Sequence, residues 1–263
     1  MEEIIVCTPK SLPLHQQVAA AEEAIRINPA NQPPMTGAAR AFSNTPLDRA
    51  RLSLLVARRW PATGIRLTVG FMDNPPADLR ARILLHMNAW GKTANVAFTE
   101  SSTNPKVRIA RANSPPDLAG YWSWLGTEIL QIPANEPTMN LEAFTMNTPE
   151  SEFHRVVRHE TGHTLGFPHE HMRRELVDKI DKAKAIALFG RTQGWSPEEV
   201  TAQVLTPLEE ASLLHTAHAD PHSIMCYQIP GSITKDGKPI VGGLDIDKRD
   251  FAFAASCYPK AVM

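Results

Sequence analysis

The sequence predicts an α/β fold, and this prediction rests on the pattern of apolar and polar residues in the N-terminal half of the chain. Between residues 64 and 144, short segments with strand-like alternation surround one segment of helical spacing, and a long predicted helix follows them. Beyond residue 171 the pattern weakens to two predicted helices joined by long loops. We therefore expect an upper subdomain, with a twisted mixed sheet and a long helix, and an irregular lower subdomain.

Length and charge bound the class of protein. The chain has 263 residues, 43% of them hydrophobic and 21% charged, which is enough for one large domain or two small ones. The formal net charge is −1, without the basic excess typical of proteins that bind nucleic acid or a membrane surface. We expect neither kind of partner, and we expect a monomer.

The first 59 residues are predicted to form a helical extension ahead of the main domain, residues 60–263. A helix is expected over 13–27, opened by Pro13, and a loop over 28–44. A second helix should follow Pro46 and run to Trp60. The start of the chain, "MEEIIVCTPK", is acidic and lacks a long apolar run, so it does not look like a secretory signal. By sequence alone the expected location is the cytoplasm.

The upper subdomain, residues 60–166, is expected to alternate strands with one helix and to end in the long helix. Pro137 favours an edge position for the last strand, because proline cannot donate a ladder hydrogen bond. Pro149 suits the start of the long helix, with Thr148 as its cap, and Gly166 suits its end. The predicted elements are a strand at 64–72, a helix at 76–92, strands at 95–100, 106–112 and 120–130, an edge strand at 137–144, and the long helix at 148–166. In the lower subdomain, residues 167–263, helices are expected at 196–213 and 245–256.

The long helix carries a metal-ligating pattern in "HETGHTLGFPHEH". His159 and His163 are four residues apart, so their imidazoles share one helical face and can bind one ion. Glu160 lies between them, where a carboxylate can reach a metal-bound water. Gly166 ends the helix and lets His169 turn back as a third ligand. Three protein ligands with an open fourth position are typical of catalytic zinc, so we expect one Zn²⁺ ion.

The wider sequence resembles the astacin family of metzincin metalloendopeptidases. The likeness spans roughly residues 60–230 and rests on "GFPHEHMR", on the turn "SIMCY" around Met225, and on the upstream strand "GYWSWLG". The resemblance implies that Met225 forms an apolar floor under the metal, that Tyr227 is a further, movable zinc ligand that stabilises the oxyanion, and that Glu170 lies behind the site. Astacins are secreted, so the resemblance also raises the possibility of secretion.

The expected function is zinc-dependent cleavage of peptide bonds in an extended protein or peptide substrate, with Glu160 as general base and then acid. Two alternatives stay open. One is a zinc-containing module that binds a partner protein without cleaving it, although a structural zinc site has no use for Glu160. The other is a zinc amidohydrolase that acts on a non-protein amide.

The three cysteines, Cys7, Cys226 and Cys257, depart from the disulfide-bonded astacin pattern, and their pairing is left open. Thiolates bind zinc well, so the N-terminal extension could be a latency segment in which Cys7 caps the zinc; an idle buried thiol is the competing interpretation.

The other histidines are expected to be structural or solvated. His215, His218 and His222 could form an auxiliary metal site, but their spacing matches no metal motif, and a solvated or hydrogen-bonded face is expected there. His154 and His171 flank the site and could orient substrate or a ligand, but they are expected at the surface, and His86 is expected to be structural.

Overall fold

The computed structural model describes residues 7–8, 10–32, 56–207 and 219–261. Its centre is a five-stranded mixed sheet with the strand order β2-β1-β3-β5-β4. All neighbouring pairs are parallel except β4 and β5, which are antiparallel. The strands are β1 (Ile65–Phe71), β2 (Val96–Glu100), β3 (Val107–Ala110), β4 (Tyr121–Ser123) and β5 (Met139–Leu141). The predicted α/β class with a mixed sheet is confirmed.

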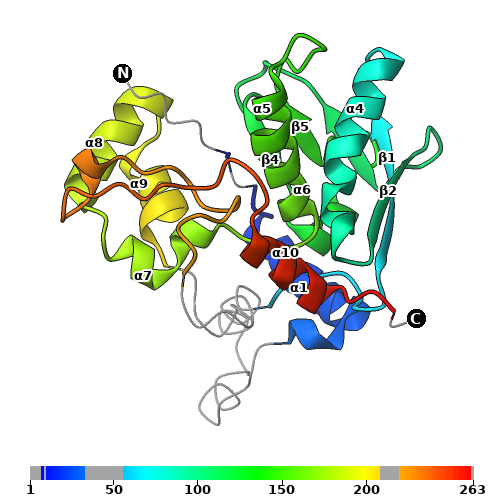
Figure 1. Ribbon diagram of the computed structural model, residues 1–263, viewed down its shortest axis with the longest axis horizontal. Coiled ribbons are helices and arrows are strands. Elements are labelled where there is room, and N and C mark those ends of the chain that lie inside the picture. The colour runs from blue at the N-terminus through cyan, green and yellow to red at the C-terminus, as the bar shows by residue number, and fades with distance from the viewer. Residues whose placement is uncertain (1–6, 9, 33–55, 208–218, 262–263) are drawn as a thin grey trace.

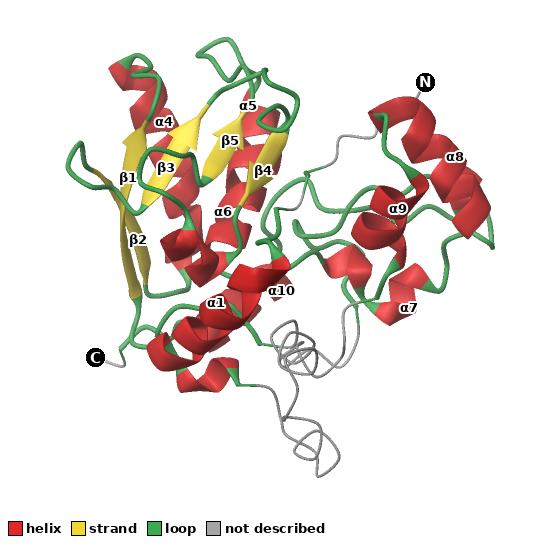
Figure 2. Cartoon of the chain, turned by 180° about the vertical axis from the view of Figure 1, so that it is seen from behind, coloured by secondary structure: helices red, strands yellow, loops and turns green. Residues whose placement is uncertain are grey.

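Two helical segments cover one face of this sheet (Figures 1 and 2). Helix α4 (Ala77–Met87) buries Leu79, Ile83 and Met87 at helical spacing and continues into a 3₁₀ turn, Asn88–Lys92. Beside it runs the long predicted helix, which is built from α5 (Glu150–Glu152), a π-helical turn (Phe153–Val157) and α6 (Arg158–Thr164). Apolar residues of the strands pack against apolar residues of both helices, so that both sets are buried away from water. This burial is the main contribution to the stability of the upper part.

Two details of the upper part were predicted wrongly. The segment 120–130 is not one strand, because β4 ends at Ser123 and a 3₁₀ helix, Gly126–Gln131, follows. The predicted edge strand around residues 137–144 is shorter, and β5 lies between β3 and β4. The edge of the sheet is β4 instead, because β4 runs back antiparallel to β5 and covers its outer side.

The helix caps also differ by a residue or more from the prediction. Pro149 takes the N-cap position of α5, where Thr148 was expected. The sequence also suggests Asn74 as the N-cap of α4, since proline follows it. The N-cap residue is Pro76 instead, and Asn74 adopts a left-handed backbone with φ of 47°.

Gly166 ends the long helix in a left-handed conformation, with φ of 90°. A Cβ atom at this position would lie 2.8 Å from the carbonyl oxygen of Arg58. The chain therefore needs glycine here both for its backbone angle and for close contact with the segment before Trp60.

We expect Gly166→Ala to destabilise the fold by more than about 1 kcal/mol, because strain and steric overlap act together. Thermal unfolding should show a loss of at least about 2–4 °C. Gly194→Ala is the matched control, since Gly194 has φ of 70° but nothing within 4 Å of its added Cβ. If both variants unfolded at the same temperature, the contact with Arg58 would have no energetic weight.

The rest of the chain beyond Gly166 is mostly short helices. The predicted helix at 245–256 is confirmed as α10, while the predicted helix at 196–213 is found as α9 with a π-helical turn, and residues 208–218 lie outside the described part. Helices α7 and α8 were not predicted. The elements are a 3₁₀ turn (Glu170–Met172), α7 (Arg174–Val177), α8 (Lys182–Gln193), α9 (Pro197–Val200), the π-helical turn (Thr201–Leu205), a 3₁₀ turn (Gly231–Ile233) and α10 (Lys248–Cys257).

The N-terminal residues begin with an extended segment at Cys7 and continue into α1 (Leu14–Ile27), as predicted, and a 3₁₀ turn (Pro29–Asn31). Most of the second predicted helix lies in residues 33–55, outside the described part, and residues 56–60 are not helical.

Buried apolar residues form two large clusters. One joins the sheet, α4, the long helix and the C-terminal residues Ala254 and Tyr258. The other joins Phe189 and Val200 to Ile229 and Tyr227. None of the helices in the described part of the chain is both long and apolar enough to cross a membrane.

Candidate metal centre

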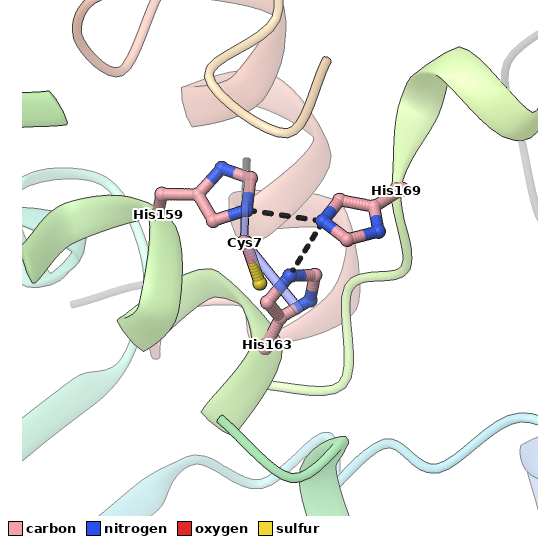
Figure 3. Close-up of side chains that lie close together, drawn as sticks. All are labelled: Cys7, His159, His163 and His169. Carbon is pink, nitrogen blue, oxygen red and sulfur yellow. Dashed lines mark hydrogen bonds between the residues drawn. The ribbon is translucent and has the colours of Figure 1, made fainter. Parts of the chain in front are cut away.

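Helix α6 presents His159 and His163 on one face, with ring centroids 4.7 Å apart (Figure 3). The turn after the helix then brings the third histidine. The amide of Phe167 donates to the carbonyl of Gly162, and the chain reverses so that His169 lies 4.4 Å from His163 and 5.2 Å from His159, between ring centroids. The structure therefore brings together the three histidines that the sequence selected.

The three Nε2 atoms converge on one point. Nε2 of His169 lies 3.2 Å from Nε2 of His159 and 3.0 Å from Nε2 of His163 (Figure 3, dashed lines). On the far side of each ring, Nδ1 of His159 lies 2.6 Å from the carbonyl of Ile224 and Nδ1 of His163 lies 2.8 Å from that of Phe167.

A cation fits this arrangement better than any set of hydrogen bonds. A carbonyl only accepts, so both Nδ1 atoms must carry the proton and both Nε2 atoms hold lone pairs. His169 can donate to at most one of them. Three nitrogen lone pairs that face one point at these distances match a tetrahedral zinc site, where Zn–N bonds of about 2.0–2.1 Å hold the ligands close together.

Electrostatics agree with this ligand set. Burial lowers the pKa of all three imidazoles, that of His163 to about 4, so each is neutral near pH 7, as a ligand must be. Glu160 is 1% exposed, and burial raises its pKa to about 8, although a hydrogen bond from Cys7 works in the other direction. A carboxyl with a pKa near neutrality is suited to both take and return a proton.

Cys7 completes the cluster. Its Sγ and the three imidazole nitrogens all lie within 4.8 Å of one another, and the thiol lies 3.4 Å from Oε2 of Glu160. Burial, and next the Glu160 charge, raise the pKa of this thiol well above its usual value. A dication in the cluster would act in the opposite sense, because a coordinating thiol is deprotonated. The four residues therefore offer one sulfur and three nitrogen ligand atoms close enough together to hold one metal ion.

The floor of the site comes from the turn around Met225. A Cβ atom on Gly162 would lie 2.4 Å from the sulfur of Met225, so helix and turn are in direct contact beneath the histidines. Glu170 lies behind the site, as expected: its amide donates to the carbonyl of Met225, and its Oε1 accepts from the amide of Asp220 at 2.9 Å. Arg173 lies 3.7 Å away, so Glu170 has partners within the chain.

Tyr227 lies beside the site, with its ring centroid 4.5 Å from that of His169. Its hydroxyl donates to the backbone carbonyl of Cys7. His171, which the sequence placed at the surface, is fully buried and stacks on Tyr227 at 3.9 Å, with Nε2 3.1 Å from the carbonyl of Gln203. That expectation for His171 is wrong, and its observed contacts fix the orientation of Tyr227.

All three cysteines are buried and free, so no disulfide joins them. Cys226 packs with the lower apolar cluster, as a small apolar residue would. Of the other histidines, His215 and His218 lie outside the described residues. Sequence reasoning also missed Arg155, which lines the cleft of about 60 Å³ that opens beside Glu160 and Tyr121. Only its place on the helix, four residues before His159, could have pointed to it.

Comparison with known proteins finds no family model that matches the chain, but it does find similar proteins. Over 104 residues, 39% of this chain, the sequence is 32% identical to zinc metalloproteinase nas-27 of Caenorhabditis elegans, and the match spans only 21% of that relative. A solved structure of myroilysin is 31% identical, superposes with a TM-score of 0.72, and is matched over 97% of its length by 78% of this chain. A crystal structure of myroilysin gives a TM-score of 0.58 at 31% identity, over 77% of this chain and 86% of that one. With these relatives, and with the extended histidine motif and the turn around Met225 in place, the chain belongs to the astacin-like zinc metalloproteinases.

Proposed function

We propose that this chain is a zinc-dependent endopeptidase whose N-terminal segment keeps it latent. One observation carries the proposal: three neutral imidazoles and a buried carboxyl of raised pKa meet in one site that opens on a cleft beside a sheet edge. A purely structural metal site would need no such acid. His159, His163 and His169 would hold the zinc.

The chemistry needs one group from outside the chain and three roles from within it. Zinc, when bound, supplies a Lewis acid and makes a water molecule reactive at neutral pH. Glu160 takes a proton from the attacking water and returns it to the amine of the departing peptide. Tyr227 already donates its hydroxyl to a peptide carbonyl in the cleft, that of Cys7. The same donor can stabilise the oxyanion of a substrate carbonyl.

The substrate is an extended peptide that pairs with the edge strand β4. The first residue of β4, Tyr121, lines the cleft and already forms an isolated parallel bridge with Cys7, where the amide of Thr8 donates to the carbonyl of Tyr121 at 2.9 Å. A free peptide can use the same backbone groups by strand addition once the segment around Thr8 has left them. The edge predicted from the sequence, at residues 137–144, is not available for this purpose.

Latency follows from the same contacts. Residues 1–59 include the segment that covers the edge at Tyr121 and places Cys7 where it would be the fourth zinc ligand. A thiolate in that position excludes the water that the reaction needs, and the segment also occupies the backbone groups that would bind substrate. Displacing it would open both together.

The function can be tested with casein and a peptide library, each incubated with the wild-type chain and with Cys7→Ala, with and without a zinc chelator. Mass spectrometry of the products gives the cleavage sites. Cleavage that requires the metal is expected, and it should be faster for the variant. The peptidase proposal fails if neither protein cleaves any peptide while zinc occupies the histidine site of each; a non-catalytic zinc module or a hydrolase of other amides would then be favoured.

A further inference from the structure

A second cluster of ligand atoms lies where the start of the long helix meets α4. His86 comes from α4, Glu150 from α5, and His154 from the π-helical turn that follows. Glu150 and His154 are one helical turn apart, and both face His86. No sequence motif joins them, because His86 is 64 residues before Glu150 and was expected to be structural.

The three ligand atoms are arranged as a metal ion requires. Oε1 of Glu150 lies 3.1 Å from Nε2 of His86 and 3.4 Å from Nε2 of His154, and all three atoms lie within 4.8 Å of one another. In a tetrahedral site with bonds of about 2.0–2.2 Å, neighbouring ligands are about 3.3–3.6 Å apart. Two histidines and a glutamate are, moreover, a ligand set that zinc uses.

His154 is oriented by a second carboxylate. Its Nδ1 lies 2.9 Å from Oδ2 of Asp245, which places the proton on Nδ1 and leaves the lone pair on Nε2, the atom that faces the cluster. A carboxylate behind a ligating imidazole is the arrangement that fixes the ring and raises its basicity in metal sites.

His86 supplies the independent sign that something is bound here. It is 2% exposed, and its Nε2 has no hydrogen-bond partner of acceptable geometry, despite the nearby Glu150 oxygen. Buried polar atoms are rarely left unsatisfied. A cation between Nε2 and the other two ligands would satisfy it.

The surrounding charges permit a cation. Arg82 lies over Oε2 of Glu150 at 2.5 Å, and Arg158 donates to Oδ1 of Asp245 at 2.6 Å, so each guanidinium already has an acid. Oε1 of Glu150 stays directed at the two imidazoles. Arg158 also donates to Nδ1 of His86 over a long 3.3 Å contact, and its guanidinium lies 3.4 Å from Nε2 of His154. Both contacts must be given up on metal binding, when Nδ1 of His86 takes a proton and Nε2 of His154 binds the ion.

We propose that His86, Glu150 and His154 form a second zinc-type metal site, separate from the catalytic cluster, that fastens the start of the active-site helix to α4. The side chain of Glu150 is 57% exposed, so the ion can enter from solvent and a water molecule can complete its coordination. Bound metal would stabilise the folded chain by mass action and hold the helix that carries His159.

The test is a zinc titration of the full-length, metal-free chain by calorimetry, with metal content measured after gel filtration. Wild type should bind two zinc ions per chain, and His154→Gln and Glu150→Gln should each bind one. Asp245→Asn should keep the second site but weaken it by about 10–100-fold. Glu152→Gln, a neighbour outside the cluster, should bind two. His154 and Glu150 are partly exposed, so these variants should fold, and unfolding curves verify that they do.

The two sites give separable outcomes. His163→Ala should lose the zinc ion of the catalytic cluster and keep the zinc ion of the second site, which is the ion that His154→Gln removes. If wild type binds one zinc, or if His154→Gln and Glu150→Gln still bind two, the second site does not exist and the cluster is a metal-free ion-pair network. Neither result depends on peptidase activity, so failure of the proposed function leaves this test intact.

Discussion

Glu160→Gln is expected to lower kcat for peptide cleavage by about 10²–10⁴-fold, because the substitution removes the group that accepts and returns the proton. The amide is nearly isosteric and fits the same buried position, so zinc binding and folding should be retained. The measurement is steady-state cleavage of one peptide found in the library, with metal content determined on the same samples. Both proteins should carry Cys7→Ala, so that latency does not mask the difference.

A matched variant keeps this result specific. Glu198→Gln removes one carboxylate from the exposed face of α9, outside the cleft, and should leave kcat unchanged. If Glu160→Gln retained more than about a tenth of the activity with full zinc content, another group would have to move the proton, since general catalysis by one residue is worth at least about 10²-fold.

Cys7→Ala is expected to raise the initial rate of cleavage by at least about tenfold. The sulfur lies within 4.8 Å of the three imidazole nitrogens and would be the fourth ligand, so its removal opens a position for water. If the bond from this ligand contributes only about 1.4 kcal/mol, its loss already raises about tenfold the fraction of molecules in which the fourth zinc position is open to water. The backbone pairing of Thr8 with Tyr121 remains in the variant, so the N-terminal segment can still cover the edge strand. A lag before full activity would then reflect the release of this segment.

Cys257→Ala is the control for the loss of a buried thiol. Cys257 packs in the upper apolar cluster, with its sulfur 3.8 Å from the guanidinium of Arg59, so its loss should affect stability and not latency. Equal rates for wild type and Cys7→Ala, at equal zinc content, would show that the thiol is idle.

The metal centre could be predicted because its geometry is local. Two histidines four residues apart must share a helical face, and a glycine with positive φ lets the third histidine return within one short turn. The family resemblance added Met225 and Tyr227, which the structure also places beside the histidines. Their distance from the motif along the chain meant that no spacing argument could have done so.

The features that the sequence did not predict depend on contacts between segments far apart in the chain. Alternation of apolar and polar residues predicts that a segment is a strand, but it does not predict which strands are neighbours in the sheet. The position of β5 between β3 and β4 depends on the path of the chain between strands, and a proline in the segment does not determine that path. The pairing of Cys7 with Glu160 joins residues 153 apart, so the thiol could only be named as a candidate. Helix α8 escaped notice because it buries only Ala185 and Phe189 and therefore has a narrow apolar face.

The residues that the histidines outside the motif contact could also not be predicted from the sequence. His171 was expected at the surface, yet stacking on Tyr227 buries it fully. His86 and His154 meet only because α4 and the long helix lie side by side on the sheet, an arrangement that helical spacing within either segment does not encode (Figure 1).

X-ray absorption at the zinc edge tests the central site most directly. We would use the full-length chain carrying His154→Gln, so that only the histidine motif competes for one equivalent of zinc. The expected spectrum has three nitrogen neighbours at about 2.0–2.1 Å and one sulfur at about 2.3 Å, and Cys7→Ala should replace the sulfur by oxygen. Fewer than three imidazole neighbours would contradict the ligand set, and three without sulfur would contradict a latent zinc held by Cys7.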